Sequence, residues 1–215
     1  MSSSVRPVAA RHGGQVEFGG APAASWTMPN GLTVIHRDTA GRGIIAASIL
    51  IRGGVLEEPS EKAGVANLVA DTLIKGAAGK SASEIALALD RLGASADFGA
   101  TSDYMEGGVV ALGPRFADAW RIFAAALTRP TFPDDQVEKE RQITLSEIAA
   151  VEDHIADATS RELNRRLYGP HPYARLVLGE SSTVESLTRE DLAAYHRRVC
   201  IPRNAVLAVV GPIRR

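Results

Sequence analysis

The stretch Gly-Ile-Ile-Ala-Ala-Ser-Ile-Leu-Ile-Arg-Gly-Gly, residues 43–54, carries the strongest structural signal in the chain. Residues 44–51 are apolar except for Ser48, and the run is far shorter than the ~20 residues of a membrane helix. A short, almost continuously apolar run rich in isoleucine and ended by paired glycines is typical of an inner strand. We therefore predict a buried strand over residues 43–52 at the centre of a sheet.

Weaker signals on both sides of this strand predict the other elements. An Asn30-Gly31 turn signal precedes a β-rich run, and residues 64–74 place apolar side chains at helical spacing. The remaining predictions are a helix capped by Ser83 and ended by Gly93, hairpin strands over residues 94–98 and 104–112, helices over residues 116–127, 134–154 and 190–199, and a strand over residues 204–210.

The order of these elements predicts the fold class. Strands come early, helices gather in the middle and a strand comes last. This order is typical of an α+β domain, with a mostly antiparallel sheet and helices packed on one face.

Composition excludes several classes of protein. The 215 residues are 45% hydrophobic and 23% charged, which is ordinary for a globular chain and excludes a disordered one. The net charge of −1 gives no electrostatic reason to expect nucleic acid or an anionic membrane as a partner. We expect no insertion into a membrane. The compartment stays open, cytoplasmic or periplasmic if the source is bacterial.

Residues 1–24 contain Ser, Gly, Ala and Pro with scattered charge, and no continuous apolar core of a signal peptide. We predict a flexible arm over residues 1–24 and one domain over residues 25–215.

The residues that most often form catalytic or metal sites are sparse. No two of the five histidines lie within four residues of each other, so none forms the i, i+4 pair that aims two nitrogens at one ion. The single cysteine, Cys200, excludes an internal disulfide and a cysteine-based zinc site. The chain also has no G-x-S-x-G segment and no phosphate-binding glycine loop.

Several segments have a family resemblance when taken in order. They are Met28-Pro29-Asn30-Gly31-Leu32, Leu92-Gly93-Ala94 with Ala100-Thr101-Ser102, Pro130-Thr131-Phe132 with Glu147-Ile148, and Tyr168-Gly169-Pro170-His171-Pro172-Tyr173 with Gly179. From about residue 28 to residue 211 the chain resembles one domain of the insulinase/pitrilysin family of zinc peptidases, close to the mitochondrial processing peptidase. The resemblance implies a metallohydrolase fold like that of the processing peptidase. Members of this family continue with a second domain, so we expect this domain to be the N-terminal half of a longer protein.

The zinc motif of that family is degenerate in this chain. Active members carry H-x-x-E-H after a G-x-A segment, with two histidine ligands and a glutamate that activates water. Here Gly64-Val65-Ala66 is followed by Asn67-Leu68-Val69-Ala70-Asp71. The resemblance puts Asn67 and Asp71 at the histidine positions and Ala70 at the position of the base. It puts the distal zinc ligand on Glu147, 76 positions after Asp71.

The chemistry of these side chains also argues against a catalytic zinc ion. A catalytic zinc ion needs three good ligands and an open position, whereas Asn67 offers a neutral amide and Asp71 and Glu147 offer carboxylates. These three residues therefore have two possible roles. They could form an oxygen-rich site, which suits Mg²⁺ or Ca²⁺ better than Zn²⁺, or a hydrogen-bonded polar cluster without metal. Ala70 cannot take a proton from water, and losing a general base typically costs about 10²–10⁴ in rate. We therefore expect no cofactor and no catalytic residue here.

Peptide binding does not need the metal. In the family that this chain resembles, the substrate peptide pairs with an exposed edge strand. Residues 96–104 would form that strand here. Phe98, Gly99, Ala100 and Thr101 are the predicted substrate contacts. Active members usually show Asn and Ala where Phe98 and Gly99 stand, which weakens this prediction.

Three functions remain open. The leading hypothesis is a non-catalytic homologue that completes the chamber of an active, zinc-bearing subunit and helps to hold peptide substrate, since family members build a closed chamber from four such domains. The second is a peptide- or protein-binding scaffold without a proteolytic partner. The third is a metallopeptidase with an atypical metal site around Asn67, Asp71 and Glu147. Unpaired apolar surface also predicts self-association as an alternative to the active partner.

Overall fold

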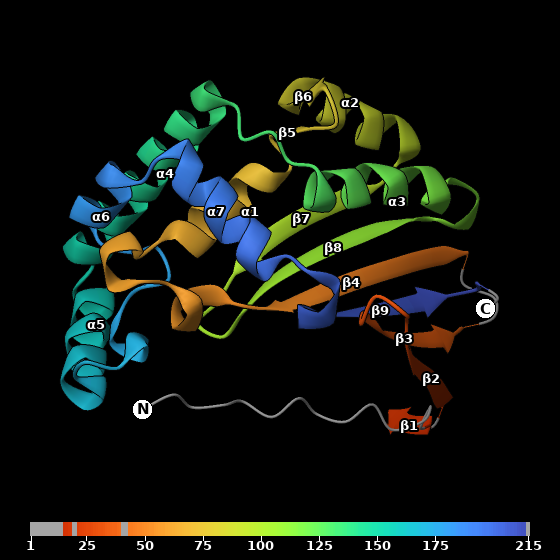
Figure 1. The fold of residues 1–215 in the computed structure, drawn as a ribbon, viewed down its shortest axis with the longest axis horizontal. Helices are drawn as coiled ribbons and strands as arrows, with labels where there is room; N and C mark the ends of the chain where they lie inside the picture. The colour runs from red at the N-terminus through yellow and green to blue at the C-terminus, as the bar shows by residue number, and fades with distance from the viewer. Residues whose placement is uncertain (1–14, 19–20, 40–42, 214–215) are drawn as a thin grey trace.

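The computed structural model describes residues 15–18, 21–39 and 43–213. These residues form one seven-stranded sheet and a separate two-stranded ribbon (Figure 1). The large sheet has the order β1-β2-β3-β9-β4-β8-β7, in which β3 and β9 are parallel and all other neighbours antiparallel. The strands are β1 (Gln15–Phe18), β2 (Ala21–Thr27), β3 (Thr33–Asp38), β4 (Ile44–Arg52), β5 (Gly76–Ala77), β6 (Lys80–Ser81), β7 (Ser95–Ala100), β8 (Tyr104–Leu112) and β9 (Ala205–Gly211).

The predicted central strand is confirmed as β4, which pairs with β9 on one side and β8 on the other. Its side chains alternate, so that Ile45, Ile49 and Ile51 are buried while Ile44 and Leu50 are exposed. The prediction that the whole strand is buried is therefore wrong for one face. The run is continuously apolar because the outer face of the sheet is itself apolar here.

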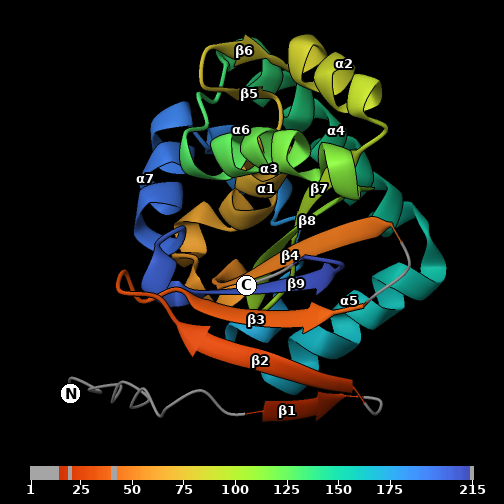
Figure 2. The ribbon, with the colours of Figure 1, turned by 90° about the vertical axis from the view of Figure 1, so that its right-hand side faces the viewer.

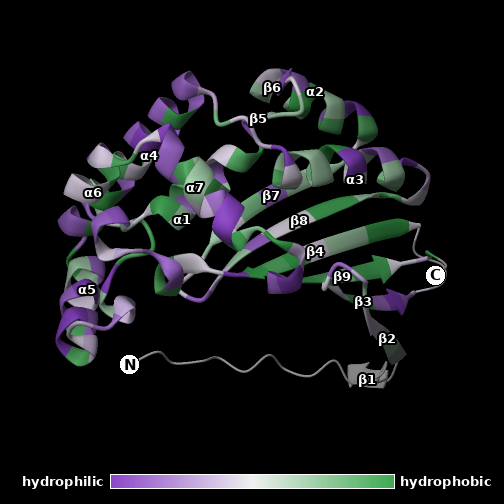
Figure 3. Ribbon diagram, in the orientation of Figure 1, coloured by the Kyte–Doolittle hydropathy of each residue, from purple (hydrophilic) through white to green (hydrophobic). Residues whose placement is uncertain are grey.

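Helices cover the inner face of the sheet, and the α+β prediction is confirmed. One core cluster joins the inner side chains of β4, β8 and β9 to α1, α3 and α7. Figure 3 shows hydrophobic residues concentrated there, while α4 and α5 at the side are largely hydrophilic. The helices are α1 (Val65–Leu73), α2 (Ala82–Leu92), α3 (Gly113–Thr128), α4 (Asp134–Asp153), α5 (Ile155–Tyr168), α6 (Ser181–Ser186) and α7 (Arg189–Val199), with short 3₁₀ turns η1 (Gly54–Glu57), η2 (Ser60–Lys62), η3 (Pro172–Ala174) and η4 (Pro202–Asn204).

The prediction of a flexible arm over residues 1–24 is wrong for residues 15–18 and 21–24. These lie in β1 and β2, which extend the sheet beyond β3 by antiparallel pairing (Figure 2). The sequence did not predict these strands because residues 21–25 are only Ala, Pro and Ser, and Ala and Pro are depleted in strands. Residues 1–14 lie outside the described part of the chain.

The cap of α2 is also corrected. Ser81, rather than Ser83, is the N-cap, and it forms a reciprocal capping box with Glu84. Serine is a preferred N-cap residue, so both serines were candidates, but only Ser81 is followed by a glutamate three positions later. Thr188 and Asp191 form a second capping box at the start of α7, a pattern that can also be seen in the sequence. Within the described residues, no helix combines the length and apolar character needed to cross a bilayer.

Candidate functional site

The candidate site is built on α1, which packs against β7, α4 and α7. Seven of its nine residues are buried, which fixes the rotation of the helix about its axis. The two exceptions are Asn67 and Asp71, which are half-buried one turn apart. Helical spacing therefore puts their side chains on one face, as the sequence predicts.

Glu58 anchors the N-terminus of α1. Its buried carboxylate accepts hydrogen bonds from the backbone N–H groups of Gly64 and Ala66, at 3.1 and 2.8 Å. These two donors have no intrahelical partner, so Glu58 caps the N-terminus of α1 although it lies outside the helix. Burial raises the pKa of Glu58, and the two backbone hydrogen bonds and Arg175 oppose that rise.

Sequence reasoning missed Glu58 and Arg175. Arg175 donates hydrogen bonds to the backbone oxygens of Val55 and Glu58, across 117 to 120 positions of sequence. One signal was present: Gly64 precedes the helix where a capping Ser, Thr, Asp or Asn would be expected. An uncapped start for a buried helix requires a partner from elsewhere.

The same end of α1 is held by a close backbone crossing. Gly64 and Gly179 both have left-handed backbone angles, with φ of 93° and 87°. The missing Cβ of Gly179 would lie 2.5 Å from the oxygen of Ala63, and that of Gly64 would lie 2.5 Å from the oxygen of Leu178. Only glycine allows the two segments to approach so closely.

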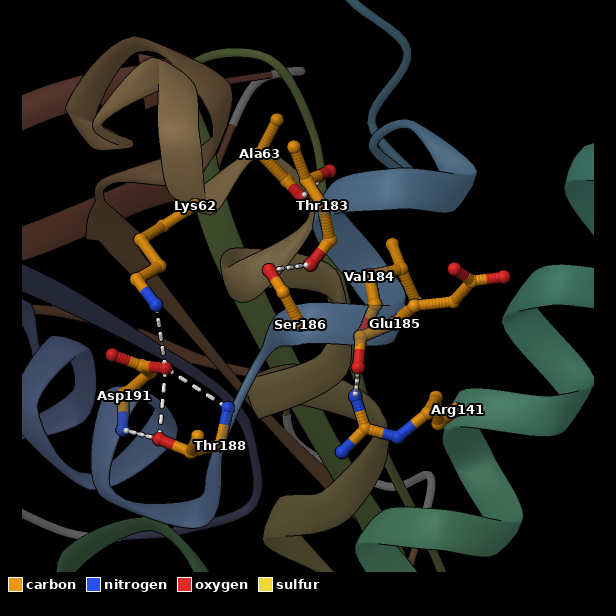
Figure 4. A network of polar contacts seen from close by, with 9 residues as sticks. All are labelled: Lys62, Ala63, Arg141, Thr183, Val184, Glu185, Ser186, Thr188 and Asp191. Atoms are coloured by element: carbon orange, nitrogen blue, oxygen red, sulfur yellow. Dashed lines mark hydrogen bonds and ion pairs between the residues drawn. The ribbon is translucent and has the colours of Figure 1, made fainter.

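Side chains around this crossing tie it to three helices (Figure 4). Thr183 on α6 donates its hydroxyl to the oxygen of Ala63 at 2.8 Å, and Arg141 on α4 donates to the oxygen of Val184. Lys62 forms an ion pair with Asp191 on α7 at 2.9 Å. The position of α1 is therefore set jointly by α4, α6 and α7.

Asn67 and Asp71 are joined to each other. The amide nitrogen Nδ2 of Asn67 donates to Oδ2 of Asp71 at 2.9 Å. Ala70, between them on the helix, is 1% exposed and belongs to the hydrophobic core. It offers no acid, base or ligand group at this face.

The carboxylates of α4 lie near this pair. Glu140 is buried and forms an ion pair with Lys75 at 2.9 Å, whereas Glu147 is exposed. Burial, followed by repulsion from Glu140 and Glu147, raises the pKa of Asp71 to about 6, despite the opposing Lys75 and Asn67. The structure thus brings the predicted residues Asn67, Asp71 and Glu147 into one electrostatic neighbourhood.

This neighbourhood does not fit a zinc ion. In the described part of the chain, no group of three or more His, Cys, Asp or Glu side chains is arranged to hold a metal. The amide of Asn67 is oriented as a donor toward Asp71, and Glu140 is paired with Lys75. A carboxylate whose pKa is raised by burial and by neighbouring acids is found in polar clusters as well as in functional sites.

The raised pKa makes stability depend on pH. Above about pH 6 Asp71 is ionised in both the folded and unfolded chain, and the folded state carries the cost; below pH 3.8 it is protonated in both. We expect Asp71→Asn to raise the free energy of unfolding by about 1–3 kcal/mol near pH 7.5 and to have no effect at low pH. Urea unfolding at the two pH values measures this, with exposed Asp90→Asn as the control. Equal stability of Asp71→Asn and wild type near pH 7.5 would contradict the expectation.

The predicted edge strand is β7, which ends the sheet next to α1. It covers Ser95–Ala100, and residues 101–103 form the turn to β8, so the predicted strand over residues 96–104 is shifted. The Thr101 N–H donates to the oxygen of Tyr104. Alternation along an antiparallel ladder then turns the backbone groups of Ala96, Phe98 and Ala100 toward the free edge.

The side chains of the predicted contacts are differently placed. The Phe98 ring points into the core, stacked on Phe123 with centroids 4.7 Å apart. The Thr101 hydroxyl organises the turn, since it donates to the oxygen of Tyr104 and accepts from the N–H of Tyr104. What this strand offers a peptide is therefore its backbone edge rather than these two side chains.

Gly107 on β8 makes room for the Phe98 ring. A Cβ at Gly107 would lie 2.5 Å from Cδ1 of Phe98 and 3.1 Å from Cζ of Phe123. We expect Gly107→Ala to lower the free energy of unfolding by about 1–3 kcal/mol, because the stacked rings must shift. Thermal or urea unfolding tests this. The neighbouring Gly108→Ala, whose Cβ would meet nothing closer than 3.6 Å, is the control, and equal losses would be evidence against the packing argument.

Comparisons with known proteins identify the family of the domain. The family model described as insulinase (peptidase family M16) matches residues 33–181. A Mycobacterium tuberculosis protein named "uncharacterized zinc protease" is 28% identical over 187 residues, which cover 87% of this chain and 43% of that protein. A Schizosaccharomyces pombe protein named as a mitochondrial-processing peptidase subunit beta is 27% identical, over 79% of this chain and 37% of that protein.

A solved structure is also similar. It is described as a peptidase M16 inactive domain from Pseudomonas fluorescens, and it has a TM-score of 0.87 and 27% identity over 90% of this chain and 47% of that chain. The chain thus spans less than half the length of the relatives it matches.

Proposed function

Because the chain belongs to the insulinase family, peptidase family M16, we propose that it is a non-catalytic member of that family. In this proposal it completes the chamber of an active, zinc-bearing partner subunit and helps to hold peptide substrate. The observation that carries the proposal is the Asn67–Asp71 hydrogen bond with Ala70 between them, at the positions where the family resemblance expects two ligands and a base.

Two chemical requirements of metallopeptidase activity are missing together. A hydrolytic zinc site needs three ligands and a group that takes a proton from water. The donor set around Asp71 does not fit the ion, and the methyl group of Ala70 cannot act as the base. The similarity to a structure described as an inactive domain supports the same proposal.

Substrate binding is proposed at the free edge of β7. An extended peptide can add a strand to an unpaired sheet edge, with backbone hydrogen bonds providing affinity. Among the described strands none pairs with this side of β7, and α1 lies beside it. A peptide seated there passes next to the polar face formed by Asn67 and Asp71.

Reconstitution tests the proposal. The chain is mixed with an H-x-x-E-H-bearing subunit of the same family, and association and peptide cleavage are measured. We expect association and an increase in the partner's cleavage rate, while this chain alone cleaves nothing. No association, or association without any stimulation, would contradict the chamber role.

A strand-edge variant separates the two parts of the proposal. Ala96→Pro removes one outward N–H from β7, at an edge position where proline is tolerated, and Ala96→Gly keeps that N–H. We expect Ala96→Pro to weaken peptide binding while leaving subunit association unchanged, and Ala96→Gly to affect neither. Peptide binding without any peptidase partner would favour a scaffold domain instead. Chelator-sensitive cleavage by this chain alone, lost in Glu147→Ala, would favour an atypical metallopeptidase.

A further inference from the structure

An apolar cavity of about 200 Å³ lies between α3 and the inner face of the sheet, and no residue of α1 or α4 lines it. Its floor consists of two cross-strand pairs, Ile49 with Leu207 and Ile51 with Ala205, on β4 and β9. All four of these residues are buried. The floor is therefore part of the hydrophobic core.

The walls are apolar as well. Trp120, Ala124 and Leu127 form one face of α3 over the floor, as their spacing of four and three residues requires. Leu32 and Cys200 close the sides. Burial raises the pKa of the Cys200 thiol to about 12, so the cavity has no charged wall near neutral pH.

Two of the segments that line the cavity are held by hydrogen bonds within the protein. The turn before β3, with Asn30 and Leu32, is held by hydrogen bonds from the N–H of Met28 to the oxygen of Leu32 and from the N–H of Leu32 to Oδ1 of Asn30. The segment after α7, with Pro202, is held by Asn204, which donates its amide to the oxygens of Arg52 and Val199. These bonds hold both segments without a ligand.

Polar groups among the lining residues are already hydrogen-bonded within the protein. Oδ1 of Asn30 accepts the N–H of Leu32 at 3.1 Å, and the Thr128 hydroxyl donates to the oxygen of Ala124 at 2.6 Å. A charged ligand entering here would lose its hydration and gain few hydrogen bonds in return. The lining therefore selects against charge.

We infer that this cavity binds a compact, uncharged apolar molecule with a single ring or two fused rings, between α3 and the β4–β9 floor. The size of the cavity supports this class, because an apolar cavity of about 150 Å³ in another protein stays dry and takes up benzene. Flat rings can stack against the Trp120 indole, which forms one wall. The site is separate from the proposed peptide edge and requires neither metal nor partner.

The test uses fluorobenzene as the probe and ¹⁹F NMR titration of the full chain. We expect saturable binding with a Kd below about 1 mM. Toluene should displace the probe, whereas benzoate, of similar size but charged, should not. In a Trp26→Phe background, which leaves Trp120 as the remaining indole, the probe should change tryptophan emission.

A filled cavity provides the decisive comparison. Ala124→Leu places extra carbon atoms in the cavity and is expected to weaken probe binding at least tenfold, whereas Ala117→Leu on the exposed face of α3 should leave it unchanged. Circular dichroism checks that both variants fold. If Ala124→Leu does not fold, the comparison of toluene with benzoate on the wild-type chain still tests the inference. No saturable binding, equal displacement by benzoate, or unchanged binding to folded Ala124→Leu would each overturn the inference. A Trp120 emission change that depends on protein concentration and not on probe would assign the cavity to a side chain of a second copy instead.

Discussion

Replacing Gly179 with alanine is expected to lower the free energy of unfolding by about 2–5 kcal/mol, the sum of backbone strain and overpacking. The φ of Gly179 is 87°, a region that costs a residue with a Cβ about 1–2 kcal/mol. The new Cβ would also lie 2.5 Å from the oxygen of Ala63 and 2.8 Å from Cα of Gly64. These are backbone atoms at the start of α1, so no side chain can rotate away to relieve the clash.

Urea unfolding of wild type, Gly179→Ala and Gly79→Ala measures this effect. Gly79 has a similar φ of 81°, but nothing lies within 4 Å of its missing Cβ. The control therefore isolates backbone strain, and its loss should stay near 1–2 kcal/mol. Equal losses in the two variants would mean that the crossing of Gly64 and Gly179 does not constrain the fold.

The second large effect is expected from restoring ligands on α1. Wild type should purify with less than a tenth of an equivalent of zinc, while Asn67→His combined with Asp71→His should hold about one equivalent. The substitutions create an i, i+4 histidine pair on one helical face. We expect Glu147, which is close enough to raise the pKa of Asp71, to supply the third ligand from α4. Because Ala70 remains, we expect metal binding without peptide hydrolysis.

Elemental mass spectrometry on protein purified without chelators, followed by competition with a fluorescent zinc chelator, measures this difference. Adding Glu147→Ala to the double variant is the control, and it should weaken zinc binding at least tenfold. Near one equivalent of zinc in wild type would contradict the proposed non-catalytic function. No zinc in a folded double variant would mean that Glu147 does not reach the histidine positions.

Local pattern was enough for most of the fold. The apolar run of residues 44–51 predicted the central strand, and the α1 periodicity placed Asn67 and Asp71 on one face. The Thr188–Asp191 box was readable because both partners lie within one helical turn. The family resemblance also rested on short segments in order, and the family model confirms it.

The sequence predictions were wrong where one local pattern is compatible with two structures. Ser81 and Ser83 are both possible caps at the start of α2, but only Ser81 precedes the helix and forms the reciprocal hydrogen bonds with Glu84. The pattern at residues 15–24 resembles a flexible arm, yet residues 15–18 and 21–24 pair as strands. Phe98 lies on the edge strand as expected, but its ring fills the core because Gly107 opposite leaves room for it.

Residues close together in the chain were sufficient to predict the central strand, the α+β class, the family and the absence of the H-x-x-E-H residues, because each of these depends on short segments of sequence. Tertiary structure alone decided how α1 is held. Glu58 caps it from outside the helix, Gly179 crosses it from 115 positions away, and the carboxylates of α4 shift the pKa of Asp71. These contacts depend on distances in the folded chain, which no local spacing encodes.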